Sequence, residues 1–143
     1  MPARLSVCLL GLLEAWLDGQ MVSGFEYTKV RGLLAYLAVE AGQPQSRLHL
    51  CDMLWPEAPE PAARQNLSQA LTKLRQALQD KDAAQPFLLV TLDGIQLNPA
   101  AQVEVDVTRF GLLVDAAEAH ARTHRAWRLC SPCADRLRQA ADL

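Results

Sequence analysis

The amino-acid sequence predicts an α+β fold, and three observations predict it. Residues 4–22 contain two β-prone segments, residues 27–80 contain three segments with helical spacing of apolar residues, and residues 87–99 resemble a β-hairpin. Strands followed by three helices and a hairpin are typical of a winged helix-turn-helix. We therefore expect an N-terminal antiparallel sheet, the helices and a C-terminal wing hairpin to form one domain over residues 1–100.

The N-terminal strands are indicated by composition and by one turn signal. Residues 4–11 are rich in strand-forming side chains, and residues 14–22 contain Asp18-Gly19. A two-residue hairpin turn requires a positive φ at both central positions, and Asp and Gly tolerate this conformation. An Asp-Gly pair between two apolar segments therefore favours such a turn. This predicts the antiparallel sheet.

The first two helices are short. Residues 27–41 place Val30, Leu33, Leu34 and Leu37 on one helical face, and a glycine and a proline follow directly.

The second helix is expected to begin after Ser46, which suits an N-cap, and to end at Trp55-Pro56. We expect Leu50, Met53 and Leu54 to form its buried face.

The third helix, residues 61–78, is the predicted recognition helix. Pro61 suits the first turn, and the apolar stripe comprises Leu67, Ala70, Leu71, Leu74 and Leu78. Glutamine amides can pair with an adenine edge, and Arg64 and Lys73 can contact phosphates. An ordinary solvated face is the alternative, but the position in a helix-turn-helix favours DNA. The candidate DNA-binding residues of this helix are Arg64, Gln65, Ser68, Gln69, Thr72, Lys73 and Gln76.

The wing is expected to reverse at Asp93-Gly94. Thr91 completes the set of candidate DNA contacts, because its hydroxyl can donate a hydrogen bond. Asp93 at the tip would repel a phosphate, so we expect this wing to pack more than it binds.

The charge balance is unusual for a DNA-binding protein. The whole chain carries a net charge of −2, and residues 24–100 contain seven Lys or Arg against eight Asp or Glu. Since phosphate neutralisation supplies much of the affinity for DNA, a single copy should bind weakly. Homodimer formation or contacts with RNA polymerase would then have to add affinity.

Other classes of protein find little support in the sequence. No apolar run approaches the roughly 18 residues that a membrane-spanning helix needs, so we expect no membrane contact. Four irregularly spaced cysteines suit a reducing cytoplasm. There is no phosphate-binding glycine loop and no nucleophile elbow, and we therefore do not expect an enzyme.

Several segments together resemble the Streptomyces antibiotic regulatory protein (SARP) type of transcriptional activators. They are LLGLLEAWLDGQMV (9–22), TKVRGLLAYLAVEAGQPQSR (28–47), MLWP (53–56), ARQNLSQALTKLRQAL (63–78) and VEVDVTRFGLLVDAAEAH (103–120). The resemblance implies a winged-helix DNA-binding domain followed by a bacterial transcriptional activator domain, a helical repeat unit. It also implies that residues 61–78 contact DNA. This sequence has Ser68, Gln69 and Thr72 where arginines are frequent in that family.

Residues 101–143 predict an α-helical hairpin. Asp106 suits an N-cap, and Phe110, Leu113, Val114 and Ala117 follow at helical spacing. Ser131 suits an N-cap in the same way, and with Pro132 after it a second helix is expected to open there. Such a pair would be the start of a TPR-like domain, here truncated, with further repeats expected after Leu143. Its unpaired apolar face would favour self-association as a homodimer.

A candidate zinc site lies in the same hairpin. His120 and His124 share a helical face, and Cys130 and Cys133 have a chelating spacing. Two nitrogen and two sulfur ligands suit a structural tetrahedral zinc. A redox pair and an incidental cluster are the other two interpretations.

Two functions from different classes therefore remain. The first is sequence-specific binding of double-stranded promoter DNA by a transcriptional activator that inserts helix 61–78 into the major groove. The second is a winged helix that serves as a protein–protein interaction surface and binds little or no DNA.

Overall fold

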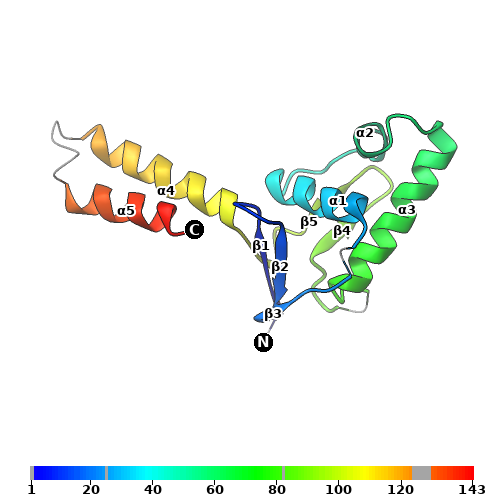
Figure 1. Cartoon of the computed structure of the whole chain (residues 1–143), viewed down its shortest axis with the longest axis horizontal. Coiled ribbons are helices and arrows are strands. Elements are labelled where there is room, and N and C mark those ends of the chain that lie inside the picture. Colours follow the sequence, from blue (N-terminus) through cyan, green and yellow to red (C-terminus); the bar gives the residue numbers. More distant parts are fainter. Residues whose placement is uncertain (1, 25, 82, 124–129) are drawn as a thin grey trace.

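The computed structural model of the chain describes residues 2–24, 26–81, 83–123 and 130–143. A small sheet and a three-helix unit lie together, and a helical hairpin extends from the sheet on the side opposite α3 (Figure 1). The helices are α1 (Thr28–Val39), α2 (Arg47–Leu54), α3 (Glu60–Ala77), α4 (Asp106–Ala121) and α5 (Ser131–Ala141). The strands are β1 (Arg4–Cys8), β2 (Glu14–Leu17), β3 (Gln20–Met21), β4 (Leu88–Val90), β5 (Ile95–Leu97) and β6 (Gln102–Val105).

The N-terminal sheet has the strand order β3-β2-β1-β6. The pairs β1–β2 and β2–β3 are antiparallel, and Asp18 and Gly19 between β2 and β3 have φ values of +49° and +83°. The predicted two-residue turn is therefore confirmed. β6 pairs with β1 in parallel, so the expectation of a purely antiparallel sheet is wrong, and the sheet is mixed.

β6 joins the sheet after the chain has passed through the helices and the wing. Arg4 on β1 forms an ion pair with Glu104 on β6, and the hydrogen bond from the guanidinium lowers the pKa of that carboxyl. Residues 102–105 belong to the part of the chain, 101–143, for which the sequence predicts a helical hairpin. They nevertheless complete the sheet that begins in residues 1–100. The division at residue 100 stays a prediction.

The helix-turn-helix has the core that the sequence predicts. Val30, Leu33, Leu34 and Leu37 of α1 are buried, as is the whole apolar stripe of α3 and Leu78 beyond it. The Ser46 hydroxyl accepts the backbone N–H of His49 at 3.1 Å, which confirms it as the N-cap of α2. Met53 is exposed, however, so its predicted burial is wrong, and Cys51 is buried beside Leu50 and Leu54 instead.

The wing consists of β4 and β5. Ile95 and Gln45 exchange two backbone hydrogen bonds of 2.9 Å, so the segment before α2 pairs with the wing. Arg47 at the start of α2 donates from its guanidinium to the carbonyl of Thr91 at 3.2 and 3.3 Å. The wing is thus fixed to the N-terminal end of α2.

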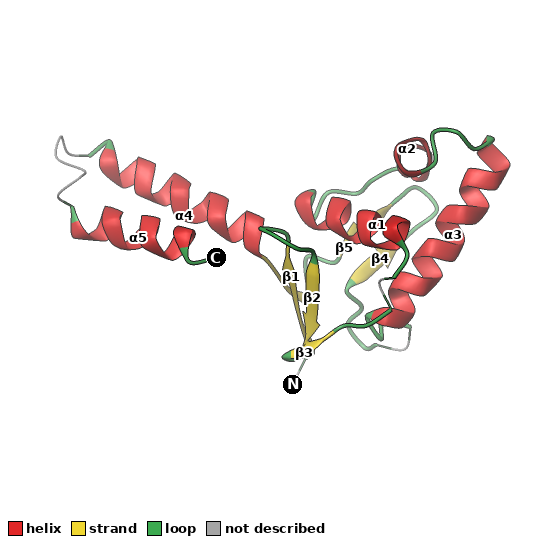
Figure 2. Cartoon of the chain, in the orientation of Figure 1, coloured by secondary structure: helices red, strands yellow, loops and turns green. Residues whose placement is uncertain are grey.

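Helices α4 and α5 form the predicted hairpin (Figure 2). The N-caps differ from the prediction: Val105 precedes α4 and Cys130 precedes α5, so Asp106 and Ser131 are the first helical residues. Among the described residues of the two helices, only Ala117, Cys133 and Ala140 are buried. No described helix of the chain is long and apolar enough to cross a membrane.

Candidate nucleic-acid interface

Helix α3 separates its apolar and polar residues onto opposite faces. Ala63, Leu67, Ala70, Leu71 and Leu74 are buried against the rest of the helix-turn-helix. All seven polar residues that the sequence singled out are exposed: Arg64, Gln65, Ser68, Gln69, Thr72, Lys73 and Gln76. Spacings of three and four residues bring them onto one continuous face, which has the chemistry of a DNA-reading helix.

Prolines and a buried carboxylate set the ends of α3. Pro59 is the N-cap, and the helix begins at Glu60, one residue before the predicted start. Gln79 has φ +54°, and this left-handed residue ends the helix. Asp80 follows, buried, and its carboxylate accepts the backbone N–H groups of Phe87 and Leu88. The end of the candidate recognition helix is therefore fixed to the start of the wing.

Two of the exposed groups already have partners in the protein. The Arg64 guanidinium lies 2.7 Å from the Glu60 carboxylate one turn earlier, and both side chains are exposed. The Thr72 hydroxyl donates to the carbonyl of Ser68 at 2.9 Å, which leaves its oxygen free to accept only. An exposed ion pair of this kind is weak, so a phosphate can compete for Arg64.

Lys73 lies against an aromatic ring. Its Nζ is 3.6 Å from the centroid of the Tyr27 ring, in a cation–π contact at the start of α1. This contact restricts the lysine to one edge of the α3 face. Lys73 is itself exposed, so its ammonium group remains open to an anion from the solvent side.

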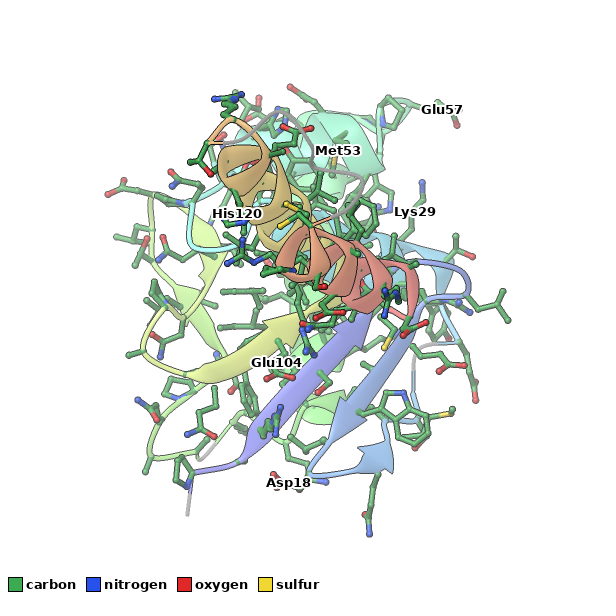
Figure 3. The ribbon with its side chains drawn as sticks, turned by 90° about the vertical axis from the view of Figure 1, so that its left-hand side faces the viewer. Asp18, Lys29, Met53, Glu57, Glu104 and His120 are labelled. Carbon is green, nitrogen blue, oxygen red and sulfur yellow. The ribbon has the colours of Figure 1, made fainter. Side chains whose placement is uncertain are left out.

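The structure adds residues that the sequence analysis did not single out. Lys29 of α1 donates from its ammonium group to the Leu54 carbonyl at the end of α2, and Figure 3 labels it. A shallow depression of about 220 Å³ runs from α1 to α3 and is lined in part by Tyr27, Lys29, Trp55, Gln69 and Lys73. Two lysines and an aromatic ring there suit a phosphate and sugar backbone. A basic residue two positions after an aromatic one at the start of α1, in Tyr27-Thr28-Lys29, was the signal in the sequence.

The wing offers less to DNA. The Thr91 hydroxyl lies 3.2 Å from the Gly94 carbonyl and 3.1 Å from the Gly94 N–H, so it stabilises the turn. Leu92 beside it is 94% exposed, and Asp93 is exposed as well. An apolar and an acidic residue at the tip give the wing no phosphate-binding chemistry of its own. The role of Thr91 in DNA binding stays a prediction.

The predicted metal ligands are brought together in part. His120, Cys130 and Cys133 have ligand atoms that all lie within 4.8 Å of one another. Burial raises the pKa of the Cys133 thiol, and its neighbour Cys130 adds to the effect. His124, the fourth predicted ligand, lies outside the described residues.

The N-terminal sheet, the three helices and the wing hairpin together form a winged helix-turn-helix. Among solved structures, the chain is similar to Mycobacterium tuberculosis EmbR, a SARP-family regulator, with a TM-score of 0.79 and 26% sequence identity. That structure is a complex of EmbR with a low-affinity phosphopeptide. The match covers 98% of this chain but only 36% of the EmbR chain. No model of a protein family matches the sequence, and no curated protein matches it either.

Proposed function

We propose that this chain is the DNA-binding part of a transcription regulator that inserts α3 into the major groove. The observation that carries the proposal is the α3 face, where every polar candidate residue is exposed while the opposite stripe is buried. The likeness to EmbR supports a regulatory rather than a catalytic role. The proposal extends to promoter DNA and RNA polymerase as partners and to activation as the outcome.

Side-chain chemistry decides which residues of α3 we expect to contact bases and which we expect to contact phosphates. Gln65, Gln69 and Gln76 offer paired donors and acceptors to base edges, of which adenine is the best match for an amide. Arg64 and Lys73 lie toward the two ends of the face and supply the phosphate contacts. Lys29, adjacent to Lys73 in the same depression, extends this basic edge toward α1. Few cations are involved, so we expect a modest salt dependence.

One observation favours a second candidate function. The wing tip presents Leu92 almost fully to solvent, next to Asp93, on a unit whose charges nearly cancel. An exposed leucine in a near-neutral surface suits a protein partner better than a phosphate backbone. On this alternative the winged helix is a protein-interaction surface.

Selection from a random duplex library, followed by binding titrations at two salt concentrations, tests the first function. Lys73→Ala should lower the slope of log affinity against log salt by about one unit. Gln69→Ala should change the preferred base at one position with little change in slope. Gln139→Ala, an exposed glutamine on α5, is the matched control and should change neither. Absence of salt-dependent binding to every duplex would overturn the proposal in favour of the protein-interaction alternative.

A further inference from the structure

Three side chains with metal-ligand chemistry meet at the end of the α4–α5 hairpin that is distant from the sheet. His120 is in the last turn of α4, Cys130 precedes α5, and Cys133 is in its first turn. His120 Nε2 and Cys130 Sγ are 3.2 Å apart, and the Cys133 sulfur lies within 4.8 Å of both. Figure 3 views the hairpin from this end and labels His120.

These distances are close to those that one tetrahedral zinc would impose. With zinc–sulfur bonds of about 2.3 Å and zinc–nitrogen bonds of about 2.0 Å, ligand atoms lie roughly 3.5–3.8 Å from each other. The His120–Cys130 separation of 3.2 Å lies just below that range, and the other two separations are at most 4.8 Å, so displacements of at most about 1 Å would complete the geometry. A nitrogen and two sulfurs also favour zinc over magnesium or calcium, which prefer oxygen ligands.

The surroundings of the three residues give a metal a structural role. Cys133 is 1% exposed and is the most buried residue of α5, facing the Ala117 carbonyl of α4. Beyond Cys133, the buried side chains in the described part of the hairpin are two alanines, which bury little apolar surface. A helix pair with so small a core is stabilised effectively by a metal that joins its two elements.

We propose that His120, Cys130 and Cys133 bind one zinc ion, which joins the end of α4 to the start of α5. The zinc fixes the angle between α4 and α5. It therefore also fixes the shape of the surface that the two helices present to any partner that packs on them. The proposal needs only these three ligands and does not depend on DNA binding. Solvent takes the fourth coordination position.

The test is the metal content of the full chain. Protein purified in a reducing buffer without chelator is loaded with zinc, dialysed against a weak competing chelator and analysed for zinc. The wild-type chain should retain about one equivalent. His120→Ala and Cys130→Ser should each lower the affinity by at least about tenfold, so that the metal is lost in dialysis. The matched controls, His49→Ala and Cys8→Ser, change the same residue types elsewhere and should retain the zinc.

Two further readouts separate metal binding from misfolding. Cobalt substitution should give a thiolate-to-metal absorption band in the wild type that is weaker in Cys130→Ser, while far-ultraviolet circular dichroism is unchanged. Zinc should slow amide hydrogen exchange in α4 and α5 but not in α3.

Less than about a tenth of an equivalent of zinc in the loaded wild type would overturn the proposal. So would full retention in both ligand variants, or a stoichiometric Cys130–Cys133 disulfide in the reducing buffer, which would indicate a redox pair. Since duplex binding is assayed separately, failure here leaves the proposed DNA-binding function intact.

Discussion

The carboxylate of Asp106 accepts the backbone N–H of Leu9, at 2.8 and 2.9 Å to its two oxygens, across 97 positions of the chain. One of these oxygens also accepts the N–H of Leu10 at 2.9 Å. Asp106 is the first residue of α4, so a single side chain connects the helical hairpin to the end of β1. Together with the β1–β6 pairing, this contact attaches the start of α4 to the N-terminal sheet of the winged helix.

Asp106→Ala should therefore loosen the hairpin from the sheet. It removes the acceptor of the backbone N–H groups of Leu9, Leu10 and Val107, of which the bonds from Leu9 and Val107 are partly buried, and an acidic residue from a helix N-terminus. We expect the free energy of unfolding to fall by about 1–2 kcal/mol. Urea denaturation measures this loss, and faster amide exchange at Leu9 and Leu10 locates it. Asp115→Asn, on an exposed part of the same helix, should change stability by less than about 0.5 kcal/mol.

Asp80→Ala should be more costly. Asp80 is 1% exposed, and its carboxylate holds the N–H groups of Phe87 and Leu88, which are buried. The alanine leaves both donors without a partner, and it also removes the acid that lies 3.9 Å from Arg75. We expect a loss of about 3 kcal/mol in the free energy of unfolding.

Asp93→Asn, which changes an exposed acid in the wing turn, is the control for Asp80→Ala and should leave the denaturation midpoint almost unchanged. Equal midpoints for the two variants would contradict the role we assign to the buried carboxylate. Because Asp80 positions the end of α3 against the wing, Asp80→Ala should also weaken duplex binding.

The parts of this fold that the sequence predicts well are those fixed by neighbours along the chain. The buried stripe of α3, the Ser46 N-cap and the Asp18-Gly19 turn each depend on residues within a few positions. The β1–β6 pairing joins segments about a hundred positions apart, and no local pattern records it. Asp106 shows the same limit, since it suits an N-cap by sequence but binds a distant backbone instead.

The candidate site also has a part that the sequence predicts and a part that it does not. Helical periodicity alone indicates which residues of α3 are exposed, and all seven polar residues that it indicates are exposed in the structure. What the periodicity does not reveal is where each polar group finds a partner. Thr91 bonds within its own turn, Arg64 pairs with Glu60, and Lys73 lies on the Tyr27 ring. Such contacts depend on rotamers and on the approach of α1, neither of which a hydrophobic pattern encodes.

Two glycines should respond in opposite directions to alanine. A Cβ at Gly94 would lie 2.8 Å from the Gln45 carbonyl oxygen, so Gly94→Ala must displace the backbone that pairs with the wing. We expect it to destabilise the protein by about 1–3 kcal/mol. A Cβ at Gly111, within α4, meets nothing within 4 Å, and alanine there should stabilise by about 0.5–1 kcal/mol. Thermal denaturation of the two variants checks both signs, and loss of stability in Gly111→Ala would contradict the second.

Glu60→Gln should separate stability from DNA affinity. The substitution removes an exposed ion pair with Arg64 and an acidic residue from the first turn of α3, which together cost about 0.5–1.5 kcal/mol of stability. It also frees the Arg64 guanidinium and removes a negative charge where we expect the DNA backbone. Duplex affinity should therefore rise by about threefold at low salt, with a steeper salt slope, even though the protein is less stable.

The control for this variant is Glu118→Gln, which makes the same change in net charge on an exposed position of α4. It should affect duplex affinity far less, because α4 lies on the other side of the molecule from α3 (Figure 1). Fluorescence anisotropy with the selected duplex at two salt concentrations measures both variants. If Glu60→Gln binds no more tightly than Glu118→Gln, the start of α3 does not face the phosphate backbone, and the placement of Arg64 at the interface is wrong.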